Sequence, residues 1–167
     1  MREEKIDFID EQIVDYLIQV ARQELSDEQA NQVYGMITIA NDIESIGDII
    51  HRNILPLVDK KRALNTDFSE EGKEELMIYH TKMCKQISRL KQAFAEQNLE
   101  TAQKIMIKEE KYLDLEEKYR LKHLHRLYQE QKESMKTHEV HMELMDIFKQ
   151  INVHTGNIAK TFLHTFK

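Results

Sequence analysis

Apolar residues recur at steps of three and four along almost the whole chain, which is the period of an amphipathic helix. The pattern predicts five helices, at about 4–24, from 27 to the region of Pro56, at about 70–96, at about 99–131 and through 140–166. Short connections between long helices favour an all-α antiparallel bundle. On the second and fifth helices, four isoleucines are expected in the core: Ile46, Ile50, Ile151 and Ile158.

Local signals mark where these helices begin and end. Ser26 followed by Gln29 reads as a capping box, in which each side chain bonds to the backbone amide of the other residue. Ser69 and Asn98 are natural caps for the next two helices. Pro56 removes a backbone donor, so the second helix is expected to kink or stop there. The polar segment 130–136 is expected to be a turn.

Composition narrows the class of protein. The 167 residues include 4 Gly, 1 Pro and 32% charged residues, which suits one helical domain. A net charge of −6 argues against nucleic-acid binding, because no general field attracts phosphate. The single Cys84 fits a reducing compartment. No apolar run approaches the roughly 20 residues of a membrane span, and the charged N-terminus lacks a secretory signal. A cytoplasmic location is therefore expected, either for a soluble protein or for the soluble part of a membrane protein.

The stretch NDIESIGD, residues 41–48, carries the clearest candidate chemistry. Glu44 and Asp48 are four residues apart, so on a helix they lie on one face and repel each other. A bound cation would compensate that repulsion. Gly47 costs a helix about 1 kcal/mol relative to Ala, which is easier to understand where a backbone or ligand comes close. The plain alternative is a solvated acidic edge.

The second and fifth helices echo each other. An offset of 105 residues places Ile46 on Ile151, but it places Glu44 on Lys149 and Asp48 on Val153. If the chain contains a duplication, one copy keeps the paired carboxylates and the other has lost them. Two unrelated amphipathic helices can produce the same apolar match, so the echo is weak by itself.

Taken in order, four segments resemble the PhoU-type regulators of phosphate uptake, most closely the PhoU-like C-terminal domain of bacterial sodium/phosphate cotransporters. They are SDEQANQVYGM (26–36), IANDIESIGDII (39–50), DFSEEGKEEL (67–76) and INVHTGNIA (151–159). The resemblance implies a pair of three-helix bundles in a single domain covering 1–167. Residues 1–64 would form a partial first bundle without its leading helix, and 65–167 a complete second bundle. The chain would then be a piece of a longer transporter, or a shortened stand-alone variant.

This resemblance implies a regulatory rather than an enzymatic role, on the cytoplasmic face of a membrane phosphate transporter. It also implies a divalent or ferric metal ion in some members, held by Glu44 and Asp48. Asp42 and His51 are the nearest additional ligands, although His51 also fits a plain surface histidine. A chain without metal is equally compatible with the fold. Because a leading helix is missing, an uncovered apolar groove is expected along the first two helices, and with it a homodimer or a swapped assembly.

Two other functions stay open at this point. One is a metal-dependent helical-bundle enzyme that uses Glu44, Asp48 and His51, and the other is a structural module for oligomerisation. A di-iron carboxylate enzyme is disfavoured, because no Glu has a His three positions later. His138 and His141 are spaced to share a metal, but no matching motif stands on another helix.

Overall fold

The computed structural model describes residues 3–166, and every regular element among them is helical. The predicted all-α fold is confirmed. The elements are α1 (Glu3–Ala21), α2 (Asp27–Asp48), a π-helical segment (Ile49–Ile54), α3 (Leu55–Ala63), α4 (Glu70–Glu96), α5 (Leu99–Tyr128), α6 (Lys132–Lys136) and α7 (His138–Thr165). Within the described residues, no helix is long and apolar enough to cross a membrane.

The predicted caps are present. Gln29 N donates to Ser26 Oγ at 3.3 Å, and Ser26 N donates to Gln29 Oε1 at 2.9 Å, which completes the capping box. Ser69 caps α4 through the amide of Gly72, and Asn98 caps α5 in the same way. The segment 130–136 was predicted to be a turn, but it contains the short helix α6.

Helix α2 does not stop at Pro56. It continues through the π-helical segment into α3, where Pro56 lies in the first turn. A π-turn holds an extra residue, and its wider ring gives room where a proline both lacks a donor and crowds the preceding turn. Ile49 is buried and Ile50 is 43% exposed, so the prediction of Ile50 in the core was wrong.

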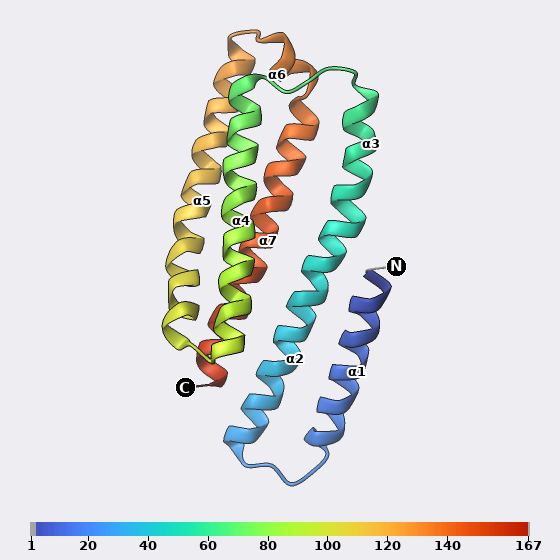
Figure 1. Cartoon of the computed structure of the whole chain (residues 1–167), viewed down its shortest axis with the longest axis vertical. Coiled ribbons are helices and arrows are strands. Elements are labelled where there is room, and N and C mark those ends of the chain that lie inside the picture. Colours follow the sequence, from blue (N-terminus) through green and yellow to red (C-terminus); the bar gives the residue numbers. More distant parts are fainter. Residues whose placement is uncertain (1–2, 167) are drawn as a thin grey trace.

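Helices α4, α5 and α7 pack against one another as a three-helix bundle (Figure 1). Ile151 and Ile158 of α7 are buried there as predicted, whereas Ile46 is half-buried at the edge of the core. Helix α2 packs along α7, and α1 packs on α2 at the margin of the molecule (Figure 1). The long antiparallel pair α1–α2 therefore presents much of its surface outside the main bundle.

Candidate functional site

Three carboxylates from two helices gather on the α1–α2 pair. Glu44 and Asp48 lie on one face of α2, and Asp7 of α1 joins them, so that one oxygen of each lies within 4.8 Å of the others. All three side chains are half-buried. Carboxylate oxygens in such a group are the ligands that hard divalent cations prefer. The sequence identified the two acids of α2 but missed Asp7, which lies 37 positions from Glu44 in the chain.

Gly47 allows α1 to approach these acids. A Cβ at this buried position would lie 3.1 Å from Cδ1 and 3.4 Å from Cγ2 of Ile6, the residue before Asp7. The glycine therefore lets the Ile6 side chain of α1 pack directly on the backbone of α2 at the level of the carboxylates. This contact gives a physical reason for a residue that otherwise weakens a helix.

The carboxylates are in electrostatic conflict. Burial, followed by repulsion from Asp48, Asp7 and Asp10, raises the pKa of the Glu44 carboxyl above its usual range, and Arg52 partly opposes that rise. Arg52 NH1 lies 2.9 Å from Asp48 Oδ2. The other oxygen, Asp48 Oδ1, is buried and accepts no hydrogen bond from the described residues. An added cation would relieve both the repulsion and this unsatisfied acceptor.

The structure does not bring Asp42 to this group. Asp42 is two residues before Glu44, so its side chain points to a different side of α2. Its Oδ1 lies 2.7 Å from Nδ1 of His154 on α7, where it ties the two helices together. His51 lies in the π-helical segment, is exposed, and is not one of the three grouped carboxylates. The third member of the group is therefore Asp7, and neither Asp42 nor His51 belongs to it.

Lys149 lies on α7, where the internal echo would place a second Glu44. Its Nζ lies 3.7 Å from Oε2 of Glu116 on α5, a carboxylate that is only 3% exposed. Arg120 also contacts Glu116 and lies 2.7 Å from Asp146. In this half of the molecule, two side-chain cations neutralise the buried acid.

A second polar cluster lies where α4, α5 and α7 meet near α6. The rings of His123 and His141 stack with centroids 4.3 Å apart, and the ring of His138 lies nearly parallel to that of His123 with centroids 5.1 Å apart. Beside them, Arg126 and Glu75 form a buried two-pronged ion pair with contacts of 3.1 and 2.7 Å.

Burial and the nearby Arg126 lower the pKa values of His123 and His141 and favour their neutral forms. Burial, with Arg126 and His138, lowers the pKa of His123 to about 4. Burial, with His123 and Arg126, lowers the pKa of His141 to about 3. The sequence singled out His138 and His141 as a candidate metal pair, but Nδ1 of His138 instead lies 2.9 Å from Nε2 of His123. Glu139 and Glu143, their neighbours in sequence, bind Lys60.

Comparison with known proteins gives one group of relatives. The chain is 26% identical over 148 residues to the "Putative inorganic phosphate export protein YjbB" of Salmonella typhimurium. Proteins of the same name from Escherichia coli and Shigella flexneri are 23% identical over the same length. Each match covers 89% of this chain but 27% of the relative, so the chain spans about a quarter of the length of these proteins. No family model and no solved structure matches the chain.

Proposed function

We propose that this chain is a regulatory domain of phosphate homeostasis that acts with a membrane phosphate transporter. The observation that carries the proposal is an alignment, covering 89% of the chain, with proteins named for inorganic phosphate export. The resemblance of four ordered segments to PhoU-type regulators supports the same role from the sequence alone. In this proposal the domain is cytoplasmic and works by binding rather than by catalysis.

A membrane transport unit is the proposed partner of this domain. The relatives are about four times as long as the matched segment, so most of each relative lies outside the region that this chain resembles. We propose that the domain controls such a neighbouring transport unit, either as part of one polypeptide or as a separate protein. A sodium-dependent cotransporter is the partner that the sequence resemblance favours.

The proposed ligand site of this domain is the group Asp7, Glu44 and Asp48. The donor set fits a divalent or ferric cation, since three acids from two helices converge on one place. When bound, the metal would supply positive charge that holds α1 against α2. Asp7 would then link the first helix to the motif of the second, so that occupancy of the site controls how firmly α1 is docked.

Phosphate flux in cells that lack the gene tests the regulatory role. We expect deletion of the gene to change the uptake or the efflux of radioactive phosphate. Expression of the unmodified chain from a plasmid should restore the flux if the chain acts as a separate protein. If the chain is part of a longer polypeptide, the whole gene product is expressed instead. Both directions must be followed, because the relatives are named for export whereas PhoU-type domains are associated with uptake. Fluxes that stay unchanged in both directions on deletion would overturn the proposal.

Metal binding is tested separately on the purified chain. Elemental analysis and calorimetric titration with Mn²⁺ and Fe³⁺ should show binding by the parent and by the matched control Glu117→Gln. The variants Glu44→Gln and Asp48→Asn should lose it. Binding that persists in both variants would remove the cation from the proposal and would leave the transport role to the flux measurement.

A further inference from the structure

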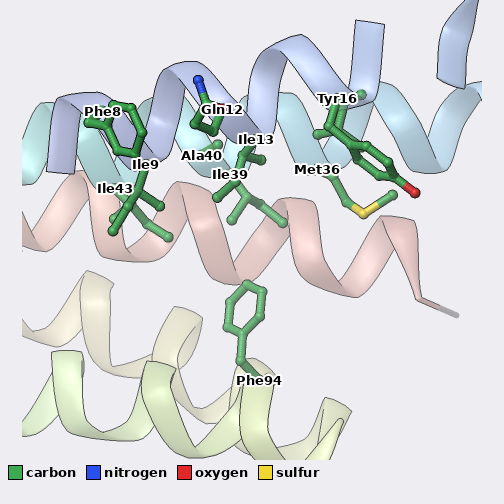
Figure 2. A pocket seen from close by; sticks show the side chains of 11 residues that line it. Phe8, Ile9, Gln12, Ile13, Tyr16, Met36, Ile39, Ala40, Ile43 and Phe94 are labelled. Carbon is green, nitrogen blue, oxygen red and sulfur yellow. The ribbon is translucent and has the colours of Figure 1, made fainter. Parts of the chain in front are cut away.

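One side of α1 carries large apolar side chains in contact with solvent. Phe8, Ile9 and Tyr16 are 61%, 55% and 65% exposed. Together with Ile43 of α2 and Phe94 of α4 they line a groove of about 630 Å³ (Figure 2). Single exposed apolar residues are ordinary on a protein surface, but a contiguous apolar patch in a groove is typical of a binding surface.

The shape of the groove fits a helix. On α1, Ile9 and Tyr16 lie two turns apart on one stripe, and on α2, Met36 and Ile43 are spaced in the same way. These stripes lie on neighbouring antiparallel helices, and Phe94 closes the far side (Figure 2). A furrow between two apolar helix faces accepts the apolar stripe of a third helix by ridge-into-groove packing.

The edge of the groove on α1 is acidic. Glu4 and Glu11 lie four and three positions from Phe8, and Asp15 lies three positions from Gln12, so these acids share the groove side of the helix. All three are exposed. Between residues 4 and 21, α1 carries five acids and one lysine. A partner that fills the groove must bring one flank against this negative rim.

The negative charge of the rim favours some binding partners for the groove over others. A symmetric dimer that packs α1 on its own copy would bring the acidic rim against itself, because the same residues meet across a two-fold axis. An anionic lipid surface would be repelled for the same reason. A helix with Lys or Arg on the flank of its apolar stripe that meets α1 has the complementary charge. The geometry points to a docking site for a basic amphipathic helix of a partner protein.

A synthetic helical peptide tests this site on the full chain. The probe is a fluorescein-labelled peptide of about 18 residues, or five turns, with Leu on one stripe and Lys on its flanks. Its matched partner has Glu in place of Lys. By anisotropy we expect the Lys peptide to bind at least about tenfold more tightly than the Glu peptide, and its binding to weaken as salt is added.

Variants of exposed positions identify the surface. Ile9→Asn, in the middle of the groove, should weaken binding of the Lys peptide about tenfold. The double variant Glu11→Gln/Asp15→Gln should weaken it about threefold and flatten its salt dependence. Tyr128→Asn is the control, since Tyr128 is 87% exposed and is the last residue of α5, a helix that does not line the groove. Circular dichroism checks that each variant keeps the helical content of the parent.

Four results would overturn the inference. Equal affinity for the Lys and Glu peptides would remove the charge argument, and binding unchanged by Ile9→Asn would place the peptide elsewhere. A homodimer that Ile9→Asn dissociates in sedimentation equilibrium would assign the groove to a second copy of the chain. Binding to anionic vesicles of phosphatidylserine and phosphatidylcholine that Ile9→Asn abolishes would assign it to a membrane surface.

Discussion

The Nζ atom of Lys149 lies 3.7 Å from Oε2 of Glu116, at the α7 position that the internal echo pairs with Glu44 of α2. The two halves of the molecule thus treat a carboxylate between neighbouring helices differently. Around Glu44, acids gather and repel. Around Glu116, the side chains of Lys149 and Arg120 neutralise the acid.

Removing these two cations should have unequal effects. Lys149→Met leaves Glu116 bonded to Arg120, and because Lys149 is 45% exposed its loss should cost about 0.5 kcal/mol. Arg120→Met leaves the buried carboxylate with a single cation at longer range and should cost about 2 kcal/mol. Urea unfolding of both variants measures the difference. Equal losses would show that Arg120 does not dominate the neutralisation.

Neutralising Glu44 should stabilise the metal-free protein. The raised pKa means that the ionised carboxyl is disfavoured in the folded state, so at neutral pH Glu44→Gln removes repulsion. Because water still partly screens the charge of this half-buried group, the gain should be a few tenths of a kcal/mol. If the proposed cation binds, the same variant should lose any rise in melting temperature on addition of Mn²⁺. Thermal melts with and without Mn²⁺ follow both effects, with Glu117→Gln as the control.

Acid should destabilise the fold through the histidine stack. Because the folded-state pKa values of His123 and His141 are lowered to about 4 and about 3, the unfolded chain takes up their protons first as pH falls. Stability is therefore fully present above the ordinary histidine pKa and is lost between about pH 6.5 and these lowered values. Each histidine contributes up to about 1.4 kcal/mol per pH unit in that window.

The variant His141→Phe isolates one of these contributions. Urea unfolding between pH 7.5 and pH 4.5 should show a shallower loss of stability than in the parent, since one buried titrating group is gone. His125→Gln, which replaces an exposed histidine on α5, is the control and should follow the parent. A slope for His141→Phe as steep as that of the parent would assign the acid sensitivity to other groups.

Enlarging Gly47 should separate α1 from α2. In Gly47→Ala, contact with the flexible end of Ile6 is offset by a helix propensity better by about 1 kcal/mol, so stability should change by less than about 0.5 kcal/mol. Gly47→Leu has no room and should cost about 1–3 kcal/mol. It should also move Asp7 away from Glu44. Urea unfolding, with hydrogen exchange on α1, compares the two variants.

Local signals predicted the helices well because they act over three or four residues. The reciprocal bonds of Ser26 and Gln29 depend on nothing outside the first turn of α2. Ile50 was misplaced because it continues the stripe of Ile43, seven positions earlier, which faces α1 and solvent rather than the main bundle. Periodicity shows that a helix has an apolar stripe, but it does not show which neighbour covers that stripe.

The candidate site was less predictable because its members meet across helices. Glu44 and Asp48 could be paired from their spacing, since both lie on α2. Asp7 could not, because which side of α1 faces α2 depends on the packing of Ile6 against Gly47. Sequence proximity favoured Asp42 as a ligand, yet His154 of α7 holds its carboxylate. The sequence gives the charge of each residue, but the packing of the helices determines which side chain that residue contacts.

The π-helical segment also sets the phase between the two halves of the long second helix. Before it, Ile46 corresponds to Ile151 at an offset of 105, and within it the pair Asn53-Ile54 matches Asn157-Ile158 at an offset of 104. A π-turn holds one residue more than an α-turn, which matches this difference of one. The residues before this segment face α1 and the carboxylates, and Leu57 after it packs into the core around α7. Deleting one residue from this segment would restore a regular α-helix. It would also rotate one of these two faces away from the helix against which it packs.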